Sequence, residues 1–282
     1  MRFFTTLLLS VLLATPALAQ QLATFNDDGL TYGHVHLNVS DMELHKRIWV
    51  EHFGGRVVEK GRNQEGNPIL TAVVLNNMLV ALSPRDPTMP SSETVMDHFG
   101  FKVRNIARFL DKWKADGFTV STQAAGFDEE TFIGSEGQIN AYIDMPGGAR
   151  VELQEDQGLQ VEIAGYHIHY RTEGHEELLQ WYTDVFNLEV RPRGRIGTTT
   201  NVPGMNLSFG GSNTPRAATQ GTAIDHVGFE IDDLEAFCQR LEAMGIEFQV
   251  PYREVPAIDL NIAYIVDPNG VRIELTEGYD EY

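Results

Sequence analysis

The sequence predicts an α+β fold built from four copies of a unit that contains one strand, one helix and three further strands. Two matches within the chain predict this repeat. The stretch "DHFGFKVRNIARFLDKWKADGFTV" (residues 97–120) matches "DHVGFEIDDLEAFCQRLEAMGIEF" (residues 225–248) in the order of its charged, aromatic and glycine residues. The stretch "GHVHLNVSDMELHKRIWVEHFGG" (33–55) matches "YHIHYRTEGHEELLQWYTDVFNL" (166–188) in the same way. Internal matches of this kind are typical of a chain assembled from repeated structural units.

Each unit is expected to open with a strand and a helix. The opening strands, "HVHLNV", "HFGFKV", "HIHYRT" and "HVGFEI", are short runs with β-branched and aromatic residues. Polar residues that favour helix starts follow three of them, at positions 40–41, 105 and 232–233. Apolar residues then recur at helical spacing, as at Ile106, Leu110 and Trp113. Gly54, Gly117 and Gly245 suit the left-handed cap that ends many helices.

A third match divides the chain into two modules. Residues 141–155 pair with residues 263–277, so that Glu152 falls on Glu274. The modules are therefore expected at residues 30–156 and 163–278, separated by "EDQGLQ". Each module contains two units, and the units are expected to pair within their own module, the first with the second and the third with the fourth.

The first residues predict export. Residues 1–19 contain a positive charge at Arg2, an apolar run and a small-residue cleavage site that ends at Ala19, which is the pattern of a secretory signal peptide. The mature protein is therefore expected to be periplasmic or secreted. No later segment is apolar enough to be expected to cross a membrane.

The composition excludes several partners. The net charge of −19 at pH 7 disfavours nucleic acid and anionic membrane surfaces as partners. The single cysteine, Cys238, allows no internal disulfide bond, so stability is expected to come from a hydrophobic core. The expected partner is a small-molecule substrate, and the oligomeric state is left open.

The histidines point to metal binding. A lone strand histidine is more often an ordinary core or surface residue, but here histidines and a glutamate recur at matched places in both modules. Two imidazoles and a carboxylate can hold a divalent metal on one side and leave positions open for a substrate. The predicted ligands form two trios, with His34, His98 and Glu152 in the first module and His167, His226 and Glu274 in the second. The candidate ions are Fe, Mn, Zn, Ni and Co.

With these motifs the chain resembles the vicinal oxygen chelate (VOC) superfamily, which includes glyoxalase I, extradiol dioxygenases and fosfomycin resistance proteins. The most recognisable segments are "DHVGFEIDDLEAFCQRLEAMGIEF" and "DPNGVRIEL". The resemblance implies pairs of βαβββ units that fold into cupped sheets, with a metal ion in each cup. It places the metal ligands at the same six residues.

The chain departs from the best-known branches of that superfamily. The strands at 77–83 and 204–210 lack the carboxylate that serves as a fourth ligand in glyoxalase I. Tyr264, Asp267 and Glu274 fit the extradiol signature, which makes Tyr264 a catalytic candidate, but residues 253–264 lack the acid–base histidine of that signature. Simple catechols are therefore expected to be poor substrates.

Other site residues follow from strand geometry, because side chains at positions i and i+2 share a face. His36 and His169 share the faces of His34 and His167, and they are candidates for the missing acid–base group. They could equally pack at the sheet edge or orient a neighbour. Arg150 and Arg272 share the faces of Glu152 and Glu274. These arginines could bind an anionic group of the substrate or hold a ligand carboxylate in place.

The expected function follows from such a site. A metal with open positions can chelate two vicinal oxygens of a small substrate and stabilise a developing enolate or oxyanion. Lyase or isomerase chemistry on a small oxygenated molecule is the leading hypothesis. One alternative is an Fe(II)-dependent extradiol-type ring-cleaving dioxygenase. The other is a non-catalytic protein that sequesters a small molecule or a metal.

Overall fold

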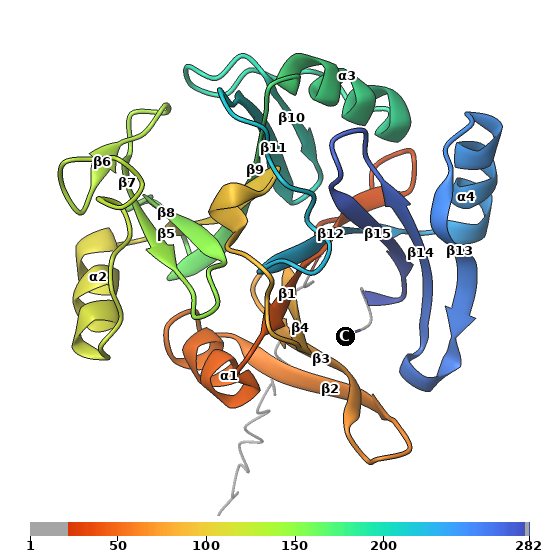
Figure 1. Ribbon diagram of the computed structural model, residues 1–282, viewed down its shortest axis with the longest axis horizontal. Coiled ribbons are helices and arrows are strands. Elements are labelled where there is room, and N and C mark those ends of the chain that lie inside the picture. The colour runs from red at the N-terminus through yellow and green to blue at the C-terminus, as the bar shows by residue number, and fades with distance from the viewer. Residues whose placement is uncertain (1–21, 280–281) are drawn as a thin grey trace, which may run out of the picture.

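The computed structural model describes residues 22–279 and residue 282 (Figure 1). The predicted signal peptide at residues 1–19 lies outside the described residues. Within the described part, no helix combines the length and the apolar character that a membrane span requires.

The four predicted units are present in chain order. The first contains β1 (Leu30–Val39), α1 (Met42–Glu51), β2 (Arg56–Arg62), β3 (Pro68–Val74) and β4 (Leu79–Pro84). The second follows the short helix η1 (Ser91–Glu93) and contains β5 (Met96–Val103), α2 (Ile106–Ala115), β6 (Phe132–Ile133), β7 (Ile139–Asp144) and β8 (Arg150–Glu155). The third contains β9 (Ile163–Thr172), α3 (His175–Phe186), β10 (Thr199–Val202) and β11 (Met205–Gly211). The fourth contains β12 (Ile224–Ile231), α4 (Leu234–Ala243), β13 (Phe248–Val255), η2 (Pro256–Ile258), β14 (Leu260–Val266) and β15 (Arg272–Glu277).

The third unit departs from the expected pattern, because it has two strands rather than three after its helix. At the place of the missing strand, Val190 pairs with Thr200 in an isolated bridge. Pro192 lies in this segment and has no N–H to donate to a ladder, and Gly194 has a positive φ of 57°. Both residues interrupt regular pairing.

The predicted helix starts and ends are confirmed. The side chains of Asp41, Asn105 and Asp233 accept hydrogen bonds from backbone N–H groups in the first turns of α1, α2 and α4. These bonds satisfy donors that have no partner inside a helix. After the same three helices, Gly54, Gly117 and Gly245 have the positive φ of a left-handed cap.

The strands form two sheets, and each sheet combines units from both halves of the chain. The eight-stranded sheet has the order β13-β14-β15-β12-β1-β4-β3-β2, so it joins the fourth unit to the first. The seven-stranded sheet has the order β10-β11-β9-β5-β8-β7-β6, so it joins the third unit to the second. At the two junctions, β1 runs antiparallel to β12 and β5 runs antiparallel to β9. The expectation that units pair within their own module is therefore wrong.

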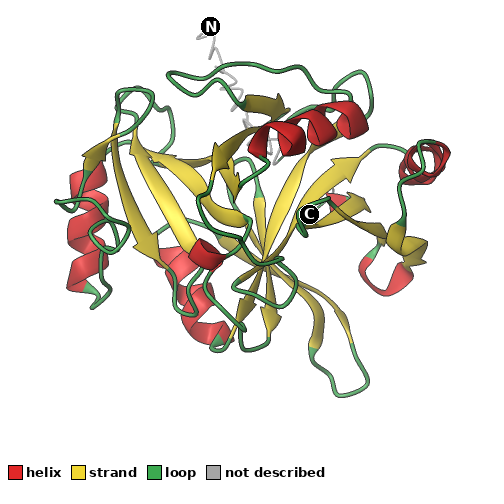
Figure 2. Cartoon of the chain, turned by 45° about the horizontal axis from the view of Figure 1, so that its top comes forward, coloured by secondary structure: helices red, strands yellow, loops and turns green. Residues whose placement is uncertain are grey.

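One large hydrophobic core lies on the helix side of the sheets. On β1, Val35 and Leu37 belong to this core, together with Trp49 of α1 and Trp113 of α2. The helices lie around the outside of the fanned strands in Figure 2. Because side chains alternate along a strand, His34 and His36 lie on the opposite face of β1. We call this face of the eight-stranded sheet cup A and the corresponding face of the seven-stranded sheet cup B.

Candidate metal centres

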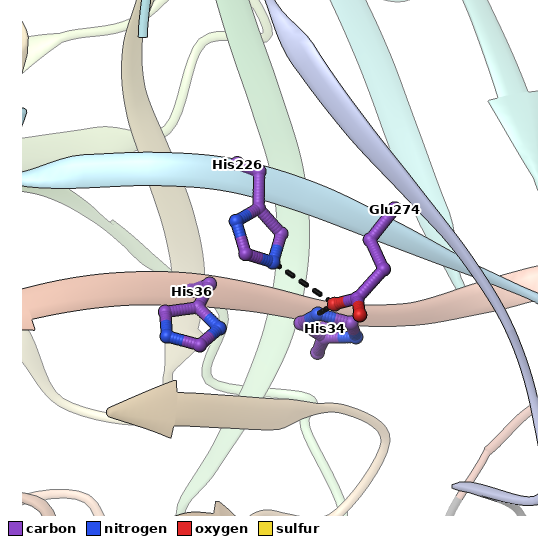
Figure 3. A group of neighbouring side chains, drawn as sticks. All are labelled: His34, His36, His226 and Glu274. Carbon is purple, nitrogen blue, oxygen red and sulfur yellow. Dashed lines mark hydrogen bonds and ion pairs between the residues drawn. The ribbon is translucent and has the colours of Figure 1, made fainter. Parts of the chain in front are cut away.

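Cup A brings three histidines and a glutamate together. His34 Nε2 and His226 Nε2 each lie 2.9 Å from the same oxygen, Oε2 of Glu274. Figure 3 shows that these side chains come from neighbouring strands and converge, with His36 beside them on the strand of His34. One potential ligand atom from each of the four residues lies within 4.8 Å of the others. His34, His226 and Glu274 are buried, whereas His36 is half-buried.

Cup B contains a group of three. His98 Nε2 lies 2.8 Å and His167 Nε2 lies 3.3 Å from Oε2 of Glu152. All three side chains are buried. His169 lies beside this group, with its ring centroid 4.9 Å from that of His98, but it is not part of the group of possible ligands.

The six predicted ligands therefore gather in two groups, but the predicted trios are wrong. His34 was expected with His98 and Glu152, and it lies instead with His226 and Glu274. His167 was expected with the latter pair and lies with His98 and Glu152. The exchange follows from the strand pairing, because β1 contacts β12 rather than β5.

A glycine in each cup makes room for the histidine that comes from the other half of the chain. Gly228 lies opposite His34 across β1 and β12, and Gly100 lies opposite His167 across β5 and β9. A Cβ atom on Gly228 would lie 2.0 Å from Cε1 of His34, and one on Gly100 would lie 2.2 Å from Cε1 of His167. Any residue other than glycine would therefore displace the imidazole.

Gly100→Ala is expected to lower the metal affinity of cup B by at least about tenfold and to leave cup A unchanged, because the added methyl group displaces only His167. The measurement is the metal content per chain after dialysis against a range of free ion concentrations. Gly228→Ala is the matched variant, and it should weaken cup A alone. Retention of both ions at wild-type affinity in both variants would contradict the assignment of His34 and His167 as ligands.

One histidine in each cup is oriented by an aspartate. His98 Nδ1 lies 2.6 Å from Asp97, and His226 Nδ1 lies 2.6 Å from Asp225. If each Nδ1 carries the donated proton, the lone pair of Nε2 faces a carboxylate oxygen, and this arrangement requires a proton or a cation between them. Carboxylate–histidine pairs of this kind are typical of metal sites. The donor sets of both cups therefore fit a divalent ion.

The ionisation of the glutamates and histidines in both cups also agrees with the binding of a divalent ion. Burial raises the pKa of Glu152 and Glu274, but hydrogen bonds from the histidines outweigh it and lower the pKa of both well below the usual value. Burial lowers the pKa of His98, but hydrogen bonds to Asp97 and then Glu152 reverse the effect and the net pKa is raised. The pKa of His167 is lowered by its burial. Each cup thus holds a buried, ionised carboxylate beside imidazole nitrogens, which is an environment that favours a cation.

Tyr264 contacts the glutamate of cup A. Its hydroxyl donates to Oε1 of Glu274, and burial raises the pKa of this hydroxyl well above its usual range. In cup B the corresponding oxygen of Glu152 accepts a hydrogen bond from Asn140 Nδ2. A catalytic role of Tyr264 stays a prediction, and its observed contact is to a ligand carboxylate.

The two predicted arginines have partners of their own. Arg272 Nη1 lies 3.1 Å from Asp225, the aspartate that orients His226. Arg150 Nε lies 3.1 Å from Asp144. Substrate binding by Arg150 and Arg272 stays a prediction, because their observed contacts position other protein groups.

Cup B has a cavity beside its ligand group. Its volume is about 170 Å³, and Glu152, His167 and His169 line it. One wall is aromatic: Phe127 and Phe132 stack with a centroid distance of 3.9 Å, and Phe132 stacks on Tyr142 at 5.2 Å.

Arg171 and Arg193 also line the cavity, and the Nε atom of each is buried and without a hydrogen-bond partner in the described structure.

Sequence reasoning missed these groups. Arg171 follows His169 by two residues on β9, so the rule that found His169 also indicated Arg171. Asp97 and Asp225 are the aspartates of the repeated Asp-His pair, so the sequence contained a signal for them. Phe127, Phe132 and Arg193 lie outside the matched stretches and gave no signal.

The comparisons with known proteins agree with this architecture. The family model described as the Glyoxalase/Bleomycin resistance protein/Dioxygenase superfamily matches residues 31–153 and again residues 166–275. Glyoxalase I from Zea mays has a similar structure, with a TM-score of 0.64, 16% sequence identity, and coverage of 88% of this chain and 92% of that chain. A putative dioxygenase from Bacillus subtilis has a TM-score of 0.64, 12% identity, and coverage of 91% and 88%.

At these identities the structural similarities show the fold alone. No curated protein is a significant match to the sequence. The family model, in contrast, covers most of the chain in its two matches, and both matched regions contribute residues to each of the two centres. The chain therefore belongs to the Glyoxalase/Bleomycin resistance protein/Dioxygenase superfamily as a member with two copies of the family module.

Proposed function

We propose that the chain is an exported, divalent-metal-dependent enzyme that acts on a small oxygenated substrate in cup B. The observation that carries the proposal is the cavity of about 170 Å³ that opens on Glu152 and His167. This volume is below the usual range of drug-sized ligand sites, so the substrate is a small molecule. Export rests on the signal-peptide pattern of residues 1–19.

His98, His167 and Glu152 would hold the ion. Two nitrogens and a carboxylate suit Fe, Mn, Zn, Ni or Co. When bound, such an ion supplies Lewis-acid polarisation of a substrate oxygen and leaves positions for that oxygen to occupy.

The other residues of the cavity would position the substrate and move its proton. The His169 imidazole lies at the cavity wall next to His98, and its burial lowers its pKa well below the usual value, which keeps it neutral, with one ring nitrogen free to accept a hydrogen bond from the substrate. Arg193 Nε has no hydrogen-bond partner and Arg171 Nε lies 3.9 Å from Asp97 without a hydrogen bond to it, so both can donate to an anionic oxygen. These roles support proton transfer next to a substrate oxygen, as lyase and isomerase reactions require.

Glu152→Ala is expected to reduce turnover by at least about a hundredfold, because two neutral imidazoles alone hold a divalent ion weakly. Protein loaded with each candidate ion would be assayed against α-hydroxy ketones, α-keto acids, vicinal diols and catechols. Glu274→Ala is the matched variant in cup A, and it should affect turnover far less.

The outcomes separate the proposal from its alternatives. Rapid cleavage of catechols by the Fe(II) form would favour a ring-cleaving dioxygenase. One ion bound in cup B with no turnover across the panel would favour a sequestering protein. Protein recovered from the periplasm with Gln20 as its first residue would support export, and retention of Met1 would contradict it.

A further inference from the structure

We infer that cup A is a closed metal centre with four protein ligands and a structural role, in which His36 is the fourth ligand and Tyr279 covers the site. The inference rests on the proposed function in one respect only, which is that these donor sets bind a divalent ion. It separates two centres that the repeat makes equivalent in sequence.

His36 and His169 occupy matched positions, but their surroundings differ. His36 belongs to the group of possible ligands in cup A, and its ring centroid lies 4.4 Å from that of His226. Ser83 Oγ lies 2.7 Å from His36 Nε2 and fixes the orientation of the ring. The residue matched to Ser83 in cup B is Gly210, and a Cβ atom there would lie 2.8 Å from Nε2 of His169. The serine that holds His36 therefore has no counterpart beside His169.

Residues 278 and 279, which follow β15, lie against cup A. After β15, the backbone N–H groups of Gly278 and Tyr279 donate to the buried carboxylate of Glu230 at 2.6 and 2.7 Å. This contact places the Tyr279 ring 4.9 Å from the His34 ring, with 2% of Tyr279 exposed. The position matched to Tyr279 after β8 is Gln157, which is exposed.

Apolar side chains pack beside the residues of cup A, because Leu79 and Ala81 lie opposite His34 and His36 across β4 and β1. Leu79 and Ala81 of β4 and Ile262 of β14 pack with Ile258 and Tyr279 in one buried cluster. In cup B, a cavity lies beside Glu152 and His167. A substrate therefore has room beside Glu152, whereas the Tyr264 hydroxyl and the His34 and His226 rings lie against Glu274.

The number of possible protein ligands also distinguishes a structural cup A from a catalytic cup B. Zinc centres in which four protein ligands complete a tetrahedron are typically structural, whereas catalytic zinc centres keep a position open. The ligands of cup A come from β1, near the start of the described chain, and from β12 and β15, near its end. An ion bound there joins the first unit to the fourth, and its binding free energy adds to the stability of the fold.

The test uses cobalt(II) as the probe, because four-coordinate cobalt(II) absorbs visible light far more strongly than six-coordinate cobalt(II). Glu152→Ala leaves cup B with two imidazoles and so provides a protein with cup A alone. Replacing His226 and Glu274 together by alanine leaves cup A with two imidazoles and so provides a protein with cup B alone. The cup A form should give the stronger visible band and should lose cobalt to a chelator at least about tenfold more slowly than the cup B form. Equal spectra and equal release rates would overturn the inference.

The matched histidines provide the sharper comparison. In the cup A form, His36→Ala should lower cobalt affinity at least about tenfold and weaken the visible band, whereas His169→Ala in the cup B form should change affinity by less than about twofold. His36→Gln is a second variant if the alanine protein fails to fold, as judged by circular dichroism. Tyr279→Ala should speed cobalt release from cup A at least about tenfold while the spectrum is retained. Equal effects of the two histidine variants would overturn the inference.

These measurements are independent of turnover. A protein that binds cobalt tightly in cup A but shows no catalysis in cup B would contradict the proposed function and leave the inference standing. A protein that is active through cup B but binds no cobalt in cup A would do the reverse.

Discussion

Replacing His34 together with His226 by alanine is expected to leave one metal ion per chain, whereas replacing His34 together with His98 leaves none. The reason is the strand pairing: His34 and His226 face the same carboxylate oxygen of Glu274, while His98 belongs to the other cup. In cup B the loss of His98 leaves two ligands, and in cup A the loss of His34 removes one of the two imidazoles that face Glu274, so each change leaves a divalent ion weakly held. The expected loss is nearly complete at micromolar free metal.

Elemental analysis of dialysed protein measures this result directly. Pairing within each half of the chain would give the opposite outcome, with one ion kept after the loss of His34 and His98 and none kept after the loss of His34 and His226. The two arrangements therefore differ by a whole ion per chain in both variants. The single variants serve as controls, and each should lose one ion.

The second large effect is expected when the halves are separated. A fragment of residues 20–158 should not fold as a monomer, because β1 loses its partner β12 and β5 loses its partner β9. Each loss leaves an unpaired strand edge in the middle of a sheet, which favours association with other chains. The fragment of residues 159–282 is left with two unpaired edges of its own, because β12 loses β1 and β9 loses β5.

Co-expression of the two fragments should restore a one-to-one complex with the circular dichroism spectrum and the metal content of the intact protein. Size-exclusion chromatography distinguishes the states of the single fragments. A monomeric single fragment that unfolds cooperatively would show that one module folds alone, contrary to the sheets described above.

The repeated units, and the residues that gather in the two groups of possible ligands, could be predicted from the sequence. The matched stretches placed His98 and His226 at the same point of their strands, and each lies in a group of possible metal ligands. Helix starts were also predictable, because Asp41 and Asp233 act locally, within a few residues of the N–H groups that they bind.

The pairing of units could not be read from the repeat, because the repeat itself is symmetric. His34 of β1 needs a glycine on the neighbouring strand, and Gly100 and Gly228 offer the same site. The lengths of the connections between units differ, and they indicate which units pair. The β8 and β9 strands flank β5 and are joined by residues 156–162 alone, whereas residues 85–95 join two different sheets. The shorter connection lies between the units that share a sheet.

The cavity of cup B could not be predicted from the sequence either. Its wall combines Phe132, from a strand of two residues, with Arg193, from the segment that replaces a strand in the third unit. Residues on irregular segments meet because of the tertiary fold, and no periodic pattern marks them.

The interleaved pairing of the four units has a consequence for how the two cups can differ. Two identical half-length chains that exchanged units would form two identical cups, and any substitution would change both at once. In a single chain each cup is encoded separately, so Ser83 beside one histidine and Gly210 beside the other can coexist. Covalent linkage also keeps the four strands of both junctions at high effective concentration. The continuous chain thus has the arrangement of units that a symmetric dimer would have, but the residues at its two sites can differ.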